Sequence, residues 1–329
     1  MDALRRALEA HLGTRIDSLE RLSGGACQEN LLLRGEGPDR VFRLDAPTAL
    51  PGSLDREAEA RVVNAAAAAG VTTPAARQFL RLPDGRGGYI MDAMPGVAIG
   101  RQVVDHPSLE SARAGLTARL GRELATIHSV SPGAAAQAGG APVETAVATL
   151  RRLLGQRTEP LLAFHLIIEW LDRHRPAETA PVLVHGDFRT GNFLVTPDGL
   201  SAILDWEFAH AGAREEDLAW ISVRDWRFGR LDRPVGGFGS RAAFYEAYAD
   251  AAGVPSLDRA AIHWWEVYGN ARWGLGCLDQ AGRYLQNAAS RAPRAETQGP
   301  RPDIELLAIG RRWTEMAFEA MRLIEEGPT

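Results

Sequence analysis

The chain of 329 residues contains no lysine, and all 37 of its cationic residues are arginine. A phosphate-binding loop of the Gly-x-x-x-x-Gly-Lys-Ser/Thr type is therefore excluded, because that motif requires a lysine. Catalytic lysines of every kind are excluded for the same reason. Any cation that binds phosphate in this protein must be an arginine.

Cysteine, long apolar runs and net charge are also scarce. The two cysteines, Cys27 and Cys277, lie far apart in the sequence, as expected in a reducing cytoplasm. No run of about 18 apolar residues predicts a membrane-spanning helix, and the amphipathic start MDALRRALEAHLG shows no signal peptide. A formal net charge of −5 does not favour binding to nucleic acid or to an anionic membrane. We therefore expect a cytoplasmic protein without such partners, and the sequence leaves its oligomeric state open.

Hydrophobic periodicity predicts a small unit of strands and helices in the first part of the chain. One helix is expected at 2–12, and an alanine-rich helix follows Ser53 and ends near Gly70, where the glycine suits a C-cap. The expected strands are 18–22, 30–34, 40–44, 78–81 and 88–92. Strands with one interposed helix are typical of a small α+β lobe, for which we expect a mixed sheet.

The pattern changes after residue 96, where we place the boundary between two lobes, 1–96 and 97–329. The expected elements of the second lobe are helices at 109–129, 143–154 and 160–175, and then a hairpin region at 182–206. Everything beyond it is expected to be helical, apart from a mobile surface loop at 290–302. The second lobe is therefore larger and mostly helical.

The segment FLVTPDGLSAILDWE predicts a β-hairpin, because two apolar strands flank Pro-Asp-Gly. A two-residue turn at Asp198-Gly199 would place Asn192 directly opposite Asp205, with Cβ atoms about 5 Å apart. A Pro-Asp-Gly turn with a bulge is the alternative, and it would shift the register by one residue. In either register both side chains lie at the open end of the hairpin.

An amide oxygen beside a carboxylate suits Mg²⁺, which takes one or two protein oxygens and completes its shell with phosphates and water. Asp187 lies five residues before Asn192, in the loop that enters the same strand. From there it can orient a hydroxyl group and accept its proton during phosphoryl transfer. The spacing Asp-x4-Asn-x12-Asp therefore favours phosphotransfer chemistry.

HGDFRTGN followed by ILDWE resembles the aminoglycoside phosphotransferase and choline kinase group of the protein-kinase-like superfamily. The resemblance implies a bilobed α+β fold, with a small sheet-bearing lobe over a larger helical lobe and ATP or GTP with Mg²⁺ between them. It implies Asp187 as the catalytic base and Asn192 and Asp205 as the Mg²⁺ ligands. His185 would hydrogen-bond the loop, and Glu207 would lie near the metal.

The first lobe carries weaker matches to the same family. REAEARVV resembles the helix whose glutamate pairs with the phosphate-binding cation, which implies Glu59, or Glu57 as the fallback. RVFRLD resembles the third strand, where Arg43 replaces the usual lysine. YIMDAMPG resembles the hinge that binds adenine through backbone groups, here around Asp92 and Met94. SGGACQEN resembles the loop over the phosphates, with Ser23, Gly24 and Gly25.

The segment FAHAGAREEDLAWISVRDWRFG resembles a bacterial branch that is similar to the kinase portion of acyl-CoA dehydrogenase fusion proteins. The expected function is a small-molecule kinase that uses a hydroxyl acceptor. A hydroxylated metabolite or hydroxyacyl thioester is favoured, with aminoglycosides and amino alcohols as alternatives. Arg43 and the sparse glycine loop leave a rival hypothesis, a nucleotide-binding pseudokinase that acts as a sensor or regulatory module.

Other polar and aromatic residues near the motif have two interpretations each. Asp217 is expected to cap or pin a helix rather than to touch substrate. The tryptophans in 263–274 are expected to pack between helices, although an aromatic cage would have the same composition. A group of arginines could contact an anionic acceptor or form a solvated face: Arg224, Arg227 and Arg230.

Overall fold

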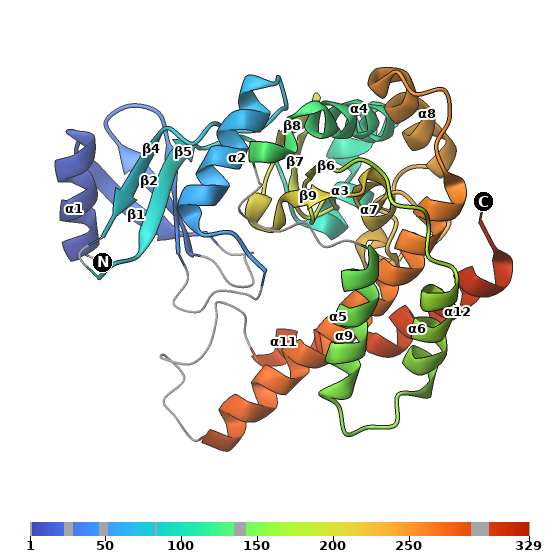
Figure 1. The fold of residues 1–329 in the computed structure, drawn as a ribbon. Coiled ribbons are helices and arrows are strands. Elements are labelled where there is room, and N and C mark those ends of the chain that lie inside the picture. Colours follow the sequence, from blue (N-terminus) through green and yellow to red (C-terminus); the bar gives the residue numbers. More distant parts are fainter. Residues whose placement is uncertain are drawn as a thin grey trace.

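The structure is a computed structural model that describes residues 2–22, 29–45, 52–82, 84–134, 143–290 and 303–328. The predicted phosphate loop with Ser23, Gly24 and Gly25, and the predicted surface loop apart from its first residue, lie outside these ranges. A sheet with two helices stands at one side of the molecule, and a larger helical body stands at the other (Figure 1).

The sheet has five strands in the order β1-β2-β3-β5-β4. Its strands are β1 (Ile16–Arg21), β2 (Glu29–Gly35), β3 (Arg40–Leu44), β4 (Gln78–Arg81) and β5 (Gly87–Asp92). Every neighbouring pair is antiparallel, so the expectation of a mixed sheet is corrected. Strands β1 and β2, β2 and β3, and β4 and β5 follow one another closely in the sequence, and strands joined by short connections pair antiparallel.

Side chains along β3 alternate between an apolar face and a polar face of the sheet. Phe42 and Leu44 are fully buried in an apolar cluster that includes Leu8 of α1 (Asp2–Leu12). Because successive side chains of a strand point to opposite faces, Arg43 projects from the other face. There it lies opposite Asn30 of β2 in the strand register.

Helix α2 (Arg56–Ala68) lies between the sheet and the helical body (Figure 1). It begins where the Asp55 carboxylate accepts a hydrogen bond of 2.7 Å from the Ala58 N–H. Such a cap satisfies one of the free donors of the first turn. The helical period then buries Glu59 completely and leaves the side chain of Glu57 55% exposed.

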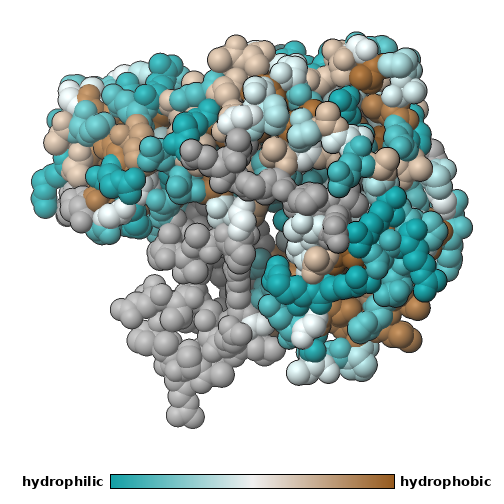
Figure 2. All heavy atoms as spheres, viewed as in Figure 1, coloured by the Kyte–Doolittle hydropathy of each residue, from teal (hydrophilic) through white to brown (hydrophobic). Residues whose placement is uncertain are grey.

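The helical body surrounds a large apolar core. Its helices are α3 (Gly100–Asp105), α4 (Glu110–Ser129), α5 (Val143–Gly155), α6 (Leu162–Arg173), α7 (Arg214–Trp220), α8 (Arg241–Ala252), α9 (Arg259–Ser290), α11 (Asp303–Gly310) and α12 (Trp313–Glu326). The helix expected at 109–129 is α4, and its apolar residues from Leu116 to Ile127 are buried. Hydrophilic residues cover much of the face shown in Figure 2. No helix in the described ranges has the length and apolar character needed to span a membrane.

Four short strands hold the motif segment. β7 (Phe193–Thr196) and β8 (Gly199–Ile203) form the predicted hairpin, while β6 (Val182–Val184) pairs with β9 (His210–Gly212). The prediction that only helix follows residue 206 is therefore wrong. A three-residue strand is too short to show a periodic pattern, and it forms here because the chain turns back alongside β6.

The hairpin register follows the bulged alternative. Thr196 pairs with Gly199, so Pro197 and Asp198 form the turn, and a bulge lies between Leu194 and Val195. The Leu204 N–H donates to the Asn192 carbonyl at 2.8 Å, so Leu204 rather than Asp205 stands opposite Asn192. Direct opposition of Asn192 and Asp205 was therefore the wrong register.

The chain between β5 and α3 passes close to this hairpin. Val97 exchanges two backbone hydrogen bonds with Val195, at 2.9 and 3.1 Å. Gly96 has a φ of +128°, and a Cβ atom there would lie 3.0 Å from the Val195 backbone nitrogen. The division into lobes at residue 96 stays a prediction.

Candidate active site

A cleft of about 710 Å³ lies where the sheet meets the β7–β8 hairpin. Its lining includes Arg43 and Tyr89 from the sheet, Asp92 and Met94 from the chain that leaves β5, and Asp205 after the hairpin. The volume is in the range of small-molecule sites. Four of the predicted site residues thus line one cleft: Arg43, Asp92, Met94 and Asp205.

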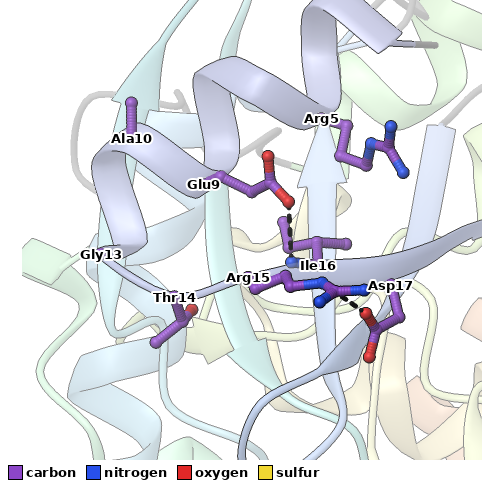
Figure 3. Close-up of a pocket in the computed structure, with 8 residues that line it drawn as sticks. All are labelled: Arg5, Glu9, Ala10, Gly13, Thr14, Arg15, Ile16 and Asp17. Carbon is purple, nitrogen blue, oxygen red and sulfur yellow. Dashed lines mark hydrogen bonds and ion pairs between the residues drawn. The ribbon is translucent and has the colours of Figure 1, made fainter.

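A second hollow, of about 700 Å³, lies beside α1 and the edge strand β1 (Figure 3). In it the Ile16 N–H donates to Glu9 Oε1 at 2.9 Å, and Arg15 pairs with Asp17 at 3.0 Å. Its lining contains no predicted site residue. The chemistry-bearing side chains therefore favour the cleft.

Arg43 forms a buried ion pair with Glu59. The Arg43 Nε donates to both carboxylate oxygens of Glu59, at 2.9 and 3.1 Å, and both residues are at most 4% exposed. Glu57 instead faces Arg61 and Arg81 at the surface. Of the two glutamates that the sequence left open, Glu59 is therefore the one that contacts Arg43.

Arg43 also reaches Asp205. Its Nη2 lies 2.5 Å from Asp205 Oδ1, and its Nη1 lies 3.4 Å from Asn30 Oδ1. Burial opposes ionisation of the Asp205 carboxyl, but the charge and hydrogen bond of Arg43 outweigh it, so the pKa of Asp205 is lowered. Asp205 itself has a left-handed backbone, with φ 68° and ψ 61°. The Asp205 carboxylate is therefore held ionised at the cleft wall.

Arg56 is a site residue that sequence reasoning missed. It is 4% exposed, contacts Glu59, and lies 3.6 Å from Glu207. Burial, followed by the charge of Asp205, raises the pKa of Glu207 to about 7. Arg43 and Arg56 thus face four acids, Asp45, Glu59, Asp205 and Glu207, and this excess of acidic groups favours a bound cation.

Asp187 is held by three side-chain donors. Its Oδ1 accepts hydrogen bonds from Arg189 Nε at 2.9 Å and from Trp220 Nε1 at 2.7 Å. Its Oδ2 accepts one from Asn192 Nδ2 at 2.7 Å. Neither Arg189 nor Trp220 was singled out by the sequence. Three donors from three different residues fix the orientation of the Asp187 carboxylate.

Asn192 and Asp205 each leave one oxygen available. The Asn192 amide nitrogen is occupied by the carbonyl and the carboxylate of Asp187, and its amide oxygen accepts no bond from the described residues. Asp205 offers Oδ2, because Arg43 uses Oδ1. These two oxygens fit a hard cation that takes its other ligands from phosphates and water. The described ranges contain no cluster of three His, Cys, Asp or Glu side chains that could hold a metal by themselves.

His185 and Asp217 hold the loop that carries Asp187. The His185 Nδ1 accepts from the Asp187 N–H at 3.2 Å, and its Nε2 lies 3.1 Å from the Leu204 carbonyl. Burial lowers the pKa of His185, which suits a neutral ring protonated on Nε2. Asp217 accepts the backbone N–H groups of His185 and Gly186, at 2.7 and 3.0 Å. Asp217 therefore fixes the loop backbone, rather than only the helix that carries it.

Asp217 is in turn supported by α4 and α8. His128 Nε2 lies 3.2 Å from Asp217 Oδ2, and His128 Nδ1 lies 2.7 Å from the Tyr248 hydroxyl. Burial opposes ionisation of Asp217, but its hydrogen bond with His128 and the nearby charges lower its pKa. A chain of buried polar groups thus joins the loop to the helical core.

Gly186 permits a close approach that any other residue would block. Its φ is +78°, and a Cβ atom would lie 2.2 Å from the Phe208 carbonyl oxygen. We expect Gly186→Ala to lower the melting temperature by roughly 5 °C or more, because backbone strain and the clash each cost about 1–3 kcal/mol. Thermal unfolding measures this, with Gly115→Ala on α4 as the control, where a Cβ meets nothing within 4 Å. Equal melting temperatures for the two variants would contradict the steric argument.

Comparison with known proteins identifies relatives for nearly the whole chain. A family model described as "Phosphotransferase enzyme family" matches residues 18–264, which is more than half of the chain. Acyl-CoA dehydrogenase family member 10 of Mus musculus is 25% identical over an alignment of 351 positions, which covers 99% of this chain. The chain spans about a third (32%) of the length of that relative.

Solved structures with a similar fold are phosphotransferases and a kinase-family protein. A candidate aminoglycoside phosphotransferase of Ralstonia eutropha JMP134 aligns with a TM-score of 0.73 and 23% identity, over 98% of this chain and 99% of that one. Spectinomycin phosphotransferase, in complex with ADP and spectinomycin, aligns with a TM-score of 0.66 and 16% identity, over 97% of this chain and 98% of that one. A choline/ethanolamine kinase family protein of Mesorhizobium loti aligns with a TM-score of 0.61 and 20% identity, over 97% of this chain and 94% of that one. At these identities the likeness shows the fold alone, and it confirms the predicted kinase-like α+β fold.

Proposed function

The chain belongs to the phosphotransferase enzyme family, and from this membership we propose that it transfers the γ-phosphoryl group of ATP or GTP, bound with Mg²⁺, to the hydroxyl group of a small molecule. One observation carries the proposal. Asn192 donates to the Asp187 carboxylate at 2.7 Å, Asp205 follows Leu204, which bonds to Asn192 across the hairpin, and Asn192 Oδ1 and Asp205 Oδ2 accept no hydrogen bond from the described residues. That arrangement supports a base beside a metal-bound phosphate.

Asp187 acts as the base in this proposal. The acceptor O–H bond breaks as its proton passes to the Asp187 carboxylate, and the acceptor oxygen forms a bond to the γ-phosphorus. The bond between that phosphorus and the oxygen bridging to the β-phosphate breaks, and the nucleoside diphosphate leaves with both electrons of that bond. When bound, Mg²⁺ supplies charge neutralisation between the phosphates. Asn192 Oδ1 and Asp205 Oδ2 are the oxygens that would hold it.

The remaining cleft residues bind and orient the nucleotide. Arg43, oriented by Glu59, offers its guanidinium to the phosphates in place of the usual lysine. Asp92 and Met94 would border the base, and the Met94 N–H donates to no other group of the described residues. Asp92 binds Arg77 at 2.9 Å, so its side chain is already engaged.

The acceptor is proposed to be a small hydroxyl compound, with neither nucleic acid nor a membrane as partner, in keeping with the net charge of −5. The name of the mouse relative supports hydroxyacyl thioesters as one class to test. The direct experiment measures ADP or GDP release against sugars, amino alcohols, aminoglycosides and hydroxyacyl thioesters, with and without Mg²⁺. Transfer to none of them, together with nucleotide binding that needs no metal in a thermal-shift assay, would favour a pseudokinase instead.

Arg43 provides a prediction about the unusual cation. We expect Arg43→Lys to retain turnover within roughly tenfold, because an ammonium can still reach Glu59 and the phosphates, although it loses the fork geometry of guanidinium. Arg43→Met should lose nucleotide affinity and destabilise the fold by about 3–5 kcal/mol, because Glu59 is left buried with a partner removed. Steady-state kinetics and denaturant unfolding measure the two effects. Full activity of Arg43→Met would contradict the assignment.

A further inference from the structure

The arginines that the sequence suggested for an anionic acceptor are mostly paired with acids. Arg227 is 2% exposed and contacts Glu266 and Glu319 at 3.0 and 2.9 Å, so it is neither a solvated residue nor an acceptor contact. Arg224 lies 3.5 Å from Glu319, and the exposed Arg230 pairs with Asp105. The cations available to an acceptor must therefore be sought elsewhere.

Two other arginines stand on the tryptophans beside Asp187. The guanidinium of Arg189 lies 4.3 Å from the ring centre of Trp226, and that of Arg272 lies 5.5 Å from the ring centre of Trp220. The two indole rings contact each other, with centres 5.8 Å apart. Trp220 donates its N–H to Asp187. One indole ring therefore separates Arg272 from the predicted base.

Arg272 is a cation without a carboxylate partner in the described part of the chain. It lies on α9 and is partly exposed. Glu216, which lies on the same helix as Trp220, is already engaged by His210 at 3.1 Å. A guanidinium stacked on an aromatic ring is held in place and is weakly hydrated, so its N–H groups are available for an oxyanion.

Arg189 occupies the position that an acceptor must enter. Its Nε donates to Asp187 Oδ1, which already accepts from Trp220. Gly191 leaves room for it, since a Cβ at Gly191 would lie 2.6 Å from Arg189 Nη1. A hydroxyl that reaches Asp187 competes with this contact. An oxyanion on the same molecule would offer Arg189 a replacement for the carboxylate that it gives up.

We propose that Arg189 and Arg272 form an oxyanion-binding subsite beside Asp187, and that the acceptor is a hydroxyl compound that also carries a carboxylate or a phosphate. This inference rests on the proposed kinase function and narrows its substrate class. Polycationic acceptors such as aminoglycosides do not suit a subsite formed by two arginines, because like charges side by side repel and lower the binding affinity. Arg272 is a specificity-determining residue, and Asp187 remains the base.

The test compares acceptors that differ in charge. ATP-dependent phosphorylation is measured with hydroxy carboxylates, the same compounds as neutral methyl esters, sugar phosphates beside the free sugars, and amino alcohols with one aminoglycoside. We expect kcat/KM to be at least about tenfold higher for an anionic member than for its neutral counterpart. The carboxylate and phosphate arms show which oxyanion the subsite takes.

Two variants on one helix assign the effect to Arg272. We expect Arg272→Gln to raise KM about tenfold for the anionic acceptor and to leave KM for ATP and kcat/KM for the neutral acceptor within about twofold. Arg259→Gln is the matched control, because Arg259 also stacks on a ring, that of Tyr245 at 4.2 Å. Arg259 begins α9 and lies about 20 Å from Arg272 along the helix axis, at a rise of 1.5 Å per residue.

The outcomes separate this inference from the function on which it rests. Preference for a cationic or neutral acceptor, or an equal loss for every acceptor in Arg272→Gln, overturns the oxyanion subsite and leaves the kinase proposal standing. Transfer to no acceptor at all overturns the kinase proposal and this inference with it. Quenching of tryptophan fluorescence by the best anionic acceptor gives a second readout. It should be present with a non-hydrolysable ATP analogue and weakened in Arg272→Gln.

Discussion

Asp187→Asn is expected to lower turnover by roughly 10²–10⁴-fold while the affinity for nucleotide stays within about twofold. An amide of the same shape cannot accept the acceptor proton. The new amide nitrogen would also face a hydrogen-bond donor that the carboxylate now binds. In one orientation this donor is Asn192 Nδ2, and in the other it is the pair Arg189 Nε and Trp220 Nε1. Both effects act on the transfer step rather than on the nucleotide, whose proposed position is against the sheet. Single-turnover kinetics with saturating ATP measure the chemical step directly.

The control for this variant is Asp198→Asn, which makes the same chemical change in the exposed turn of the hairpin. It should retain full activity. Nucleotide affinity is measured by titration calorimetry for both variants, so that a loss of folding is not mistaken for a loss of chemistry. Undiminished turnover of Asp187→Asn with its best acceptor would remove Asp187 from the role of base.

Asp205→Ala is expected to weaken the binding of ATP in the presence of Mg²⁺ by at least about tenfold, or 1.4 kcal/mol. The change removes one of the two free oxygens offered to a divalent cation and leaves the buried Arg43 with Glu59 as its carboxylate partner. Calorimetric titration with ATP in Mg²⁺ and then in EDTA separates the two contributions. The loss should be concentrated in the Mg²⁺ titration.

The ion pair between Arg43 and Asp205 also leads to a prediction for ATP binding in EDTA, where no metal is bound. In the wild-type protein Asp205 pairs with Arg43, and under the proposed function it would compete with the phosphates for this arginine, which the variant leaves freer to bind them. Metal-free ATP should therefore bind Asp205→Ala at least as well as it binds the wild type. Glu57→Ala, which removes an exposed carboxylate from α2, is the control and should change neither titration. Equal weakening of Asp205→Ala in Mg²⁺ and in EDTA would argue against Asp205 as a metal ligand.

Several elements were predictable from local sequence, because turn residues, helix caps and the spacing of apolar residues are all local features. The strands of the sheet, the capped helix α2 and the hairpin around Pro197 all follow from turn residues and apolar spacing. The contact of Asp187 with Asn192, and the position of Asp205 one residue beyond the partner of Asn192, followed from their spacing around that hairpin. The register did not follow, because a bulge at Leu194 and Val195 is decided by packing rather than by the turn sequence alone.

The residues that sequence reasoning missed act across long separations. Arg56 reaches Glu207, and Trp220 reaches Asp187 from a helix 33 residues later. In a chain whose cations are all arginine, nothing local distinguishes the buried Arg227 from the partly exposed Arg272. One signal was available for Arg189, since an arginine two residues after the predicted base must lie near the reaction. The others required the tertiary contacts.

The arginine on β3 also determines how this protein responds to chemical probes. Reagents that tag nucleotide sites by acylating the ε-amine of a lysine need a neutral, nucleophilic nitrogen. Arg43 offers none: burial opposes its charge, but Glu59 and Asp205 outweigh this and raise the pKa of a guanidinium that is protonated at any ordinary pH. Activity-based surveys that enrich kinases through amine acylation will therefore pass over this cleft. Arginine-selective dicarbonyls will not reach Arg43 readily either, because it is 4% exposed.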